Sequence, residues 1–316
     1  MIEGEVGGIA MGDSYPVRII GARSLSRESF YEGSVAKGLD EVLERARRFI
    51  SEGADVIDIG GMSTAPYKET WITEEAEINR LLPVVGELAR AVKAPISVDT
   101  YRPAVAEKVL SAGAMIINDV SGLGVHPSLA KVVSDHGASI ITCARVPESS
   151  GPVQIGDPVG LLNRSIERTI RILVKENVNK RKVAIDPCIG FSSLRPSDEP
   201  HASGGIYRQG STSWPFWKWD SYIVGNLWKF RRSGLPIVVG VSRKSFIRRI
   251  CEVDDPERVV FGSVAAEAIA VMNGAHAIRT HNPFESRQAI RIAESIKKEV
   301  HQGAKPRSRP ALEKRS

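Results

Sequence analysis

A repeating order of elements constrains the fold of this chain more than any other feature of its sequence. Between residues 16 and 301, short apolar runs typical of buried strands alternate with stretches in which apolar residues recur at helical spacing. The run from Ile96 to Val98 shows the unit most clearly, because Asp99 follows it and a helix start, T-Y-R-P, follows at Thr100. Counting eight such units predicts an α/β fold, a single (β/α)₈ barrel of the TIM type.

The predicted strands are short and the predicted helices are longer. Strands are expected at 16–21, 54–59, 96–98, 114–118, 138–143, 182–186, 236–241 and 275–279. Helices are expected at 39–52, 74–92, 103–111, 129–136, 159–176, 216–232, 258–273 and 284–301. Long loops follow the first and second strands, at 24–34 and 60–72, and an aperiodic insertion at 192–214 precedes the sixth helix. We interpret that insertion as a lid or a mobile segment.

Length and charge are consistent with one domain followed by a tail. At 316 residues with 42% hydrophobic content, we assign residues 1–302 to the barrel and 303–316 to a basic, disordered tail. The net charge of +6 would suit a nucleic-acid partner, but much of the excess lies in that tail, where no aromatic residue is interleaved. We therefore predict no nucleic-acid partner.

The same sequence predicts a soluble, cytoplasmic protein without a membrane partner. The start M-I-E-G-E-V-G-G lacks the blocks of a signal peptide, and no run of about 18 apolar residues is present. The three cysteines, Cys143, Cys188 and Cys251, show neither paired nor metal-ligand spacing.

Polar side chains follow seven of the eight predicted strands, and the carboxyl ends of barrel strands meet at one mouth. Some have a structural explanation as well: Asp58 as a buried hydrogen-bonded acid, Asp119 as a turn cap, Arg243 as a surface ion pair. Taken together they predict a shared site. They are Ser24, Asp58, Ser63, Thr64, Asp99, Asn118, Asp119, Asp186, Ser242, Arg243, Lys244, Arg279 and His281.

The residue types suggest two kinds of ligand group at this mouth. Inward carboxylates and an amide suit the edge of a heterocycle with adjacent N–H groups, as in guanine or a pterin. Lys244, Arg279 and His281 supply the opposite charge, which suits phosphate oxygens. His281 is the one member of this set whose ordinary pKa lies near neutrality.

Several stretches, in order along nearly the whole chain, resemble the dihydropteroate synthase family. They are I-D-I-G-G-M-S-T from Ile57, I-S-V-D-T from Ile96, G-A-M-I-I-N-D-V-S-G from Gly113, D-P-C-I-G-F from Asp186, V-S-R-K-S-F-I from Val241 and R-T-H-N from Arg279. The resemblance implies a homodimeric barrel transferase of folate-type cofactor synthesis. Such an enzyme joins hydroxymethyl-dihydropterin diphosphate to an arylamine, p-aminobenzoate, and releases diphosphate with the assistance of Mg²⁺.

The resemblance also implies roles for individual residues. Asp99, Asn118, Asp186 and Lys244 would hold the pterin, and Arg279 and His281 the diphosphate. Of these, Asp99, Lys244, Arg279 and His281 form the predicted catalytic group. The predicted substrate-binding set is completed by Phe30, Thr64, Phe191 and Ser245.

Two departures from the family pattern affect the expected substrates. Ser24 stands where the family has an Asn that meets the diphosphate and the metal, so Ser24 is at most a weak metal ligand. Ala65 stands where an Arg helps to bind aminobenzoate. The sequence resembles archaeal members, whose acceptor is a ribofuranosyl-aminobenzene phosphate of methanopterin synthesis. The alternatives are a pterin-dependent methyltransferase of the same superfamily and a non-catalytic pterin-binding paralogue.

Overall fold

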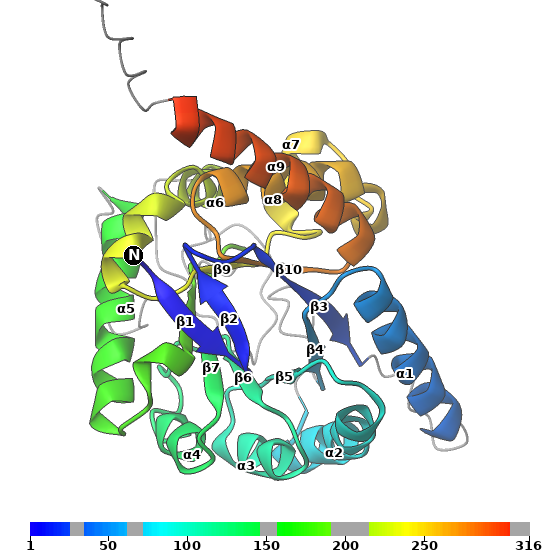
Figure 1. The fold of residues 1–316 in the computed structure, drawn as a ribbon. Coiled ribbons are helices and arrows are strands. Elements are labelled where there is room, and N and C mark those ends of the chain that lie inside the picture. Colours follow the sequence, from blue (N-terminus) through cyan, green and yellow to red (C-terminus); the bar gives the residue numbers. More distant parts are fainter. Residues whose placement is uncertain (26–34, 62–71, 146–156, 191–214, 304–316) are drawn as a thin grey trace, which may run out of the picture.

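A barrel of eight parallel strands forms the centre of the molecule in the computed structural model, which describes residues 1–25, 35–61, 72–145, 157–190 and 215–303 (Figure 1). The sheet order is β8-β7-β6-β5-β4-β3-β10-β9, and a bridge between Ile185 and Ile237 joins its two edges. The predicted (β/α)₈ barrel is confirmed. The strands are β3 (Arg18–Ser24), β4 (Val56–Gly60), β5 (Ile96–Asp99), β6 (Ile116–Asp119), β7 (Ser139–Cys143), β8 (Val183–Asp186), β9 (Val238–Val239) and β10 (Ala277–Thr280).

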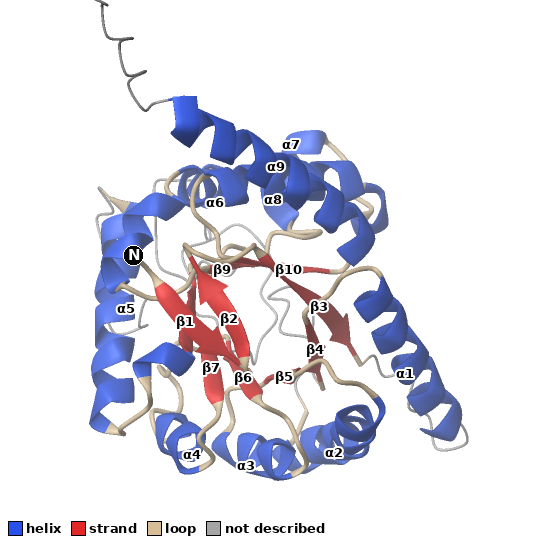
Figure 2. Ribbon diagram, viewed as in Figure 1, coloured by secondary structure: helices blue, strands red, loops and turns tan. Residues whose placement is uncertain are grey.

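Helices surround the strands, as Figure 2 shows. Local signals fix where several begin: the Thr73 hydroxyl accepts the Ala76 N–H at 3.2 Å, Asp157 accepts the Val159 N–H at 3.1 Å, and Pro103 opens its helix as predicted. The helices are α1 (Val35–Ser51), α2 (Glu74–Ala91), α3 (Pro103–Ser111), α4 (Leu129–Asp135), α5 (Pro158–Lys175), α6 (Phe216–Gly225), α7 (Ser245–Cys251), α8 (Val260–Met272) and α9 (Pro283–Gly303). No described helix is long and apolar enough to cross a membrane.

The structure corrects the predicted elements in three places. The helix predicted at 216–232 breaks at Asn226, whose φ of −125° is not helical, and continues as a 3₁₀ helix at Leu227–Ser233. The short helix α7, about two turns long, was missed because it begins inside the V-S-R-K-S-F-I stretch, between the predicted strand at 236–241 and the predicted helix at 258–273. The first barrel strand runs from Arg18 to Ser24, later than the predicted 16–21.

An unpredicted β-hairpin closes the amino end of the barrel. Its strands are β1 (Glu3–Val6) and β2 (Ile9–Gly12), and Figure 1 shows the hairpin lying across the barrel. The Gly7 N–H donates to Ser139 Oγ at 2.9 Å, at the start of β7. Val6 and Met11 are fully buried against the inward side chains of the barrel strands. Each hairpin strand is only four residues long, so its alternating pattern was too short to be recognised in the sequence.

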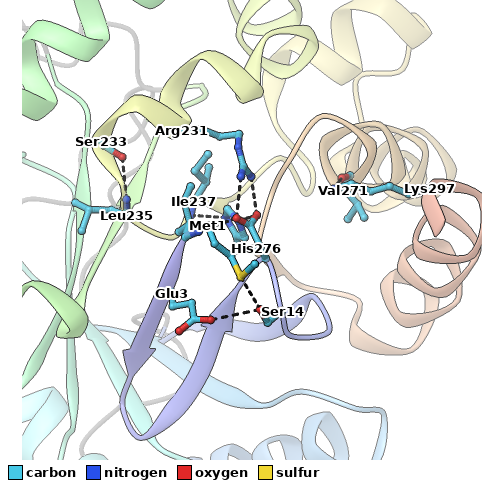
Figure 3. A network of polar contacts seen from close by, with 12 residues as sticks. Met1, Glu3, Ser14, Arg231, Ser233, Leu235, Ile237, Val271, His276 and Lys297 are labelled. Atoms are coloured by element: carbon cyan, nitrogen blue, oxygen red, sulfur yellow. Dashed lines mark hydrogen bonds and ion pairs between the residues drawn. The ribbon is translucent and has the colours of Figure 1, made fainter. Parts of the chain in front are cut away.

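Asp13, just after the hairpin, links it to the 3₁₀ helix at Leu227–Ser233 and to His276, the residue before β10. Its carboxylate accepts both Arg231 guanidinium N–H groups, at 2.7 and 2.8 Å, and these bonds hold the pKa of Asp13 well below its usual range. The Ile237 N–H donates to His276 Nδ1 at 3.0 Å, so Nε2 carries the ring proton and faces Asp13 at 3.3 Å. Burial lowers the pKa of His276 and keeps it neutral. Figure 3 shows Arg231 and His276 lying close to each other near Met1.

The predicted long loops, the insertion and the tail lie mostly outside the described residues. These are residues 26–34, 62–71, 191–214 and 304–316.

Candidate functional site

The carboxyl ends of neighbouring strands gather the predicted polar residues. Asp99 ends β5 and pairs in register with Gly60 on one side and Asn118 on the other, and Asp186 ends β8. Arg279 lies in β10, and Lys244 follows β9 immediately before α7. Because all eight strands are parallel, these residues share one end of the barrel, opposite the hairpin.

Arg279, itself partly exposed, is the centre of a charge network with two buried carboxylates. Its Nε donates to Asp58 Oδ2 at 2.7 Å, and a terminal guanidinium nitrogen lies 2.6 Å from the same oxygen. That nitrogen also lies 3.5 Å from Asp99 Oδ2. The Ser97 hydroxyl donates to the other Asp58 oxygen at 2.6 Å. Arg279 is therefore fixed by protein carboxylates from two strands.

Asp99 carries the unsatisfied acceptor of this network. Its side chain is 7% exposed, and within the described part of the chain its Oδ1 is buried without a hydrogen-bond partner. Burial raises the pKa of Asp99 to about 7, while the Arg279 charge works in the opposite direction. A ligand N–H group would satisfy this oxygen and favour the ionised form.

Asp186 and Lys244 form a second pair of opposite charge. Burial raises the pKa of Asp186 and lowers that of Lys244 to about 8, and each charge partly offsets the effect on the other. Asp186 Oδ1 accepts the Cys188 N–H at 2.7 Å. Gly190 makes room for Lys244, because a Cβ there would lie 2.7 Å from Lys244 Cδ.

His281 differs from its sequence-based interpretation. Its Nδ1 lies 3.1 Å from Ser242 Oγ. Burial, together with the Arg279 and Arg243 charges, lowers the pKa of His281 to about 3. The pKa of His281 therefore departs from its ordinary value near neutrality, because burial and then the neighbouring cations disfavour its charged form. A neutral imidazole can offer an anion a hydrogen bond but no charge.

Two of the strand-end residues have structural roles. Asp119 accepts the Ser121 and Leu123 N–H groups at 2.8 and 2.7 Å, which confirms its interpretation as a turn cap. Arg243 pairs with the exposed Glu257 and donates to Asn282 at 3.2 Å, which confirms the ion-pair interpretation.

The remaining predicted residues are placed only in part. Ser24 ends β3 opposite Gly60, Asn118 is buried in β6, and Ser245 begins α7. Phe30, Ser63, Thr64, Ala65 and Phe191 lie outside the described residues.

Sequence reasoning missed Ser97, which orients Asp58. It included Ser242 among the strand-end residues but did not assign it the contact with His281. The available signal was a polar residue inside an otherwise apolar strand, as Ser97 is within I-S-V-D. A buried polar side chain of this kind needs a partner.

The expectation that the cysteines show no pairing was also wrong. Cys143 and Cys188 form a disulfide with their Cα atoms 5.1 Å apart, although 45 positions separate them in sequence. They meet because β7 and β8 are neighbours, which sequence spacing alone does not reveal. Cys251 is free and exposed.

No group of three or more His, Cys, Asp or Glu side chains able to hold a metal occurs among the residues that the structure describes. Mg²⁺ commonly takes some of its oxygen ligands from phosphates.

Comparison with known proteins gives consistent results. Residues 24–212 and 218–281 match the family described as pterin binding enzyme. The chain is 29% identical over 285 residues to dihydropteroate synthase of Bacillus subtilis, covering 90% of this chain and 89% of that one. It is 28% identical over 288 residues to a probable bifunctional folylpolyglutamate synthase/dihydropteroate synthase of Haloferax volcanii, covering 89% of this chain and 31% of that one. The structure of Xanthomonas albilineans dihydropteroate synthase with 4-aminobenzoic acid superimposes with a TM-score of 0.76 at 26% identity, covering 93% and 97% of the two chains.

Proposed function

This chain belongs to the pterin binding enzyme family, and from that membership we propose that it is a transferase of the dihydropteroate synthase type. It condenses a dihydropterin-methyl diphosphate with an arylamine, p-aminobenzoate in folate synthesis, and releases diphosphate. One observation carries the proposal: buried acids, with an unsatisfied oxygen on Asp99, share the mouth with the cations Lys244 and Arg279. The mouth thus offers acceptors to a pterin edge and positive charge to a diphosphate.

The chemistry of this substrate needs both signs of charge. Breaking the methylene carbon–oxygen bond leaves a cation delocalised into the pterin ring. The fixed carboxylates of Asp99 and Asp186 stabilise that cation, because they are already oriented in a site of low polarity. Lys244 and Arg279 stabilise the departing diphosphate, with His281 donating a neutral hydrogen bond. The arylamine nitrogen is already a neutral nucleophile, so its attack needs little activation, and the proton it loses once the carbon–nitrogen bond has formed passes to the released diphosphate or to water.

We also propose that Mg²⁺ accompanies the diphosphate. Ser24, at the end of β3, would be a weak protein ligand, and phosphate oxygens would supply most of the coordination. Bound there, the ion would neutralise charge that develops on the leaving group.

Diphosphate release tests the proposed function. The protein is incubated with dihydropterin-methyl diphosphate, first with p-aminobenzoate and then with a ribofuranosyl-aminobenzene phosphate. Release that depends on an acceptor supports the synthase. Pterin binding without release under any condition would favour the non-catalytic paralogue instead. The methyltransferase alternative has no need of Lys244 and Arg279, so the presence of both cations counts against it.

We expect kcat/KM to follow a bell-shaped pH profile. Asp99 must be ionised to accept a pterin N–H, so activity falls as the pH drops below about 7. Lys244 must be protonated to bind an anion, so activity falls above about 8. Steady-state kinetics between about pH 5 and pH 10 measures both limbs. Asp99→Asn should remove the acidic limb, and a wild-type profile that stays flat across neutrality would contradict both assignments.

The same Asp99 pKa predicts how stability depends on pH. The pKa of Asp99 in the folded protein, about 7, lies above its ordinary value. Its contribution to the free energy of unfolding is therefore fully present below the pKa of the unfolded state and is lost as the pH rises through about 7. The free enzyme should therefore unfold more easily at pH 8 than at pH 5 through this group, and a bound pterin should reverse the trend.

Ala65→Arg is expected to improve the use of p-aminobenzoate. An Arg offers a planar fork to its carboxylate, and a charge-assisted bond of this kind contributes roughly 1.5–3 kcal/mol, whereas Ala contributes no such bond. We therefore propose that the native protein prefers an acceptor without that carboxylate, with Arg23, Arg27 or Lys68 reaching a phosphate. KM for both acceptors in both proteins measures the effect. A native micromolar KM for p-aminobenzoate that Arg does not improve would rule out this preference.

The archaeal character suggested by Ala65 is part of the same proposal. The relatives described above include bacterial proteins and one archaeal protein, so they give it no support. The kinetic comparison of acceptors is what decides it.

We propose a homodimer, in which exposed apolar side chains of α8 and α9 are covered. On α9, Ile292, Ile296 and Val300 recur every four residues and are 64%, 50% and 60% exposed. Phe261 and Ile269 of α8 are 86% and 52% exposed. Faces of this kind commonly mark an interface.

The cytoplasmic location and the lack of nucleic-acid and membrane partners remain predictions from the sequence.

A further inference from the structure

The disulfide lies at the carboxyl ends of two neighbouring barrel strands. Cys143 is the last residue of β7 and pairs in register with Asp186, the last residue of β8. Cys188 follows Asp186 by two residues, and the bond joins it back to Cys143. Both cysteines are buried, at 4% and 5% exposure. The disulfide therefore attaches the end of β7 to the segment that carries Asp186.

The backbone turn at Cys188 determines where the Asp186 carboxylate lies. Cys188 has a φ of +65°, in the left-handed region that non-glycine residues rarely adopt. In this conformation its N–H donates to Asp186 Oδ1 at 2.7 Å. The Ala144 N–H, next to Cys143, donates to the Asp186 carbonyl at 2.7 Å. A conformation of this kind persists where its surroundings hold it, and the disulfide supplies a covalent constraint at that residue.

The same turn also supports Lys244. Gly190 has a φ of +78°, and the Lys244 stem fills the space where its Cβ would be. The Gly190 N–H donates to Asp220 Oδ1 of α6 at 3.0 Å. Residues 186–190 therefore connect Asp186, the disulfide and Lys244. A change of conformation at Cys188 would move the acid and disturb the contact with the cation.

We propose that Cys143 and Cys188 are positioning residues for pterin binding: their disulfide holds the left-handed turn that orients Asp186, and reducing it weakens binding. This inference rests on the proposed function, which assigns the pterin to Asp186. Reduction by a dithiol passes two electrons and two protons to the protein, so that the Cys143–Cys188 bond becomes two thiols while the dithiol becomes a disulfide.

The experiment measures pterin affinity by titration calorimetry with the full-length protein, oxidised and after dithiol treatment. Thiol titration under denaturing conditions verifies each state: one free thiol when oxidised and three when reduced, since Cys251 is free in both. We expect the reduced protein to bind about tenfold more weakly, the effect of misaligning one charge-assisted hydrogen bond. Cys251→Ser is the matched control, and it should behave as the wild type in both states.

Two double variants separate positioning from simple stabilisation. Cys143→Ala with Cys188→Ala removes the bond and leaves a side chain that disfavours the left-handed turn, so it should bind as weakly as the reduced protein. Cys143→Ala with Cys188→Gly also removes the bond, but glycine adopts this turn without strain, so affinity should return to within about twofold of the oxidised protein. Both variants should show a lower Tm, because both lose the cross-link.

The outcomes distinguish this inference from the function on which it rests. Equal pterin affinity in the oxidised, reduced and Ala/Ala proteins would overturn the positioning role and leave the proposed function standing. If the variant with Cys188→Gly binds pterin no better than the variant with Cys188→Ala, the left-handed turn is not the feature that the disulfide maintains. Three free thiols in the aerobically purified protein would remove the premise. Failure of the oxidised wild type to bind any pterin would overturn the proposed function as well.

Discussion

Arg279→Met is expected to lower the free energy of unfolding by about 3–5 kcal/mol and to abolish turnover, because it leaves buried carboxylates without their cation. Asp58 is 1% exposed and Asp99 is 7% exposed, and Arg279 contacts both. Methionine keeps much of the length of the side chain and removes only its charge and donors. Denaturant titration measures the loss, and diphosphate release measures the activity.

A second substitution tests whether the uncompensated charge is the cause. Asp58→Asn keeps the shape of the side chain and an oxygen that can accept the Ser97 hydroxyl, but it removes one buried charge. The double variant should recover a large part of the stability and none of the activity. The deficit of Arg279→Met should also shrink at acid pH, since Arg279 normally lowers the pKa of Asp99. Wild-type stability of Arg279→Met near pH 8 would refute the network.

Asp186→Ala is expected to weaken pterin binding by about 2–4 kcal/mol, or roughly thirtyfold to a thousandfold. The substitution removes the charged acceptor that we propose for the ring N–H groups and also removes the acceptor of the Cys188 N–H. Titration calorimetry with a dihydropterin measures the change.

Asp186→Asn separates the two effects. Its amide oxygen can keep the Cys188 N–H bond, while its amide nitrogen presents a donor where the pterin also presents donors. We expect the Asn variant to unfold like the wild type and to bind pterin as poorly as the Ala variant. A folded Asp186→Ala protein that binds pterin with wild-type affinity would show that Asp186 does not accept hydrogen bonds from the pterin ring.

The barrel could be predicted because its signals are local and repeated. Each apolar run followed by a polar residue is an independent observation, so a misplaced boundary such as 16–21 did not change the architecture. Asp99 and Asp186 could be assigned to one site for the same reason, since parallel strands must end together.

The missed features depend on contacts between distant parts of the chain. The Cys143–Cys188 bond needs the order of the strands, which no spacing in the sequence contains. The lowered pKa of His281 depends on its burial in the assembled barrel and on the positions of Arg279 and Arg243 around it. The role of Asp58 needs the direction of the Arg279 side chain, which arrives from a strand 221 residues later. Such properties follow from the assembled barrel and not from any one segment.

The hairpin at the amino end of the barrel bears on how the chain reaches its fold. Asp13 is separated by 218 residues from Arg231 and by 263 from His276, so these contacts join parts of the chain that are far apart in the sequence. Contacts of such high sequence separation carry the greatest loop-closure entropy and tend to form late. We infer that the hairpin docks late, in the same stage as the pairing of β10 with β3, whose partners Arg18 and Ala277 are similarly far apart in the sequence. Weakening Asp13 should then accelerate unfolding while the folding rate stays almost constant.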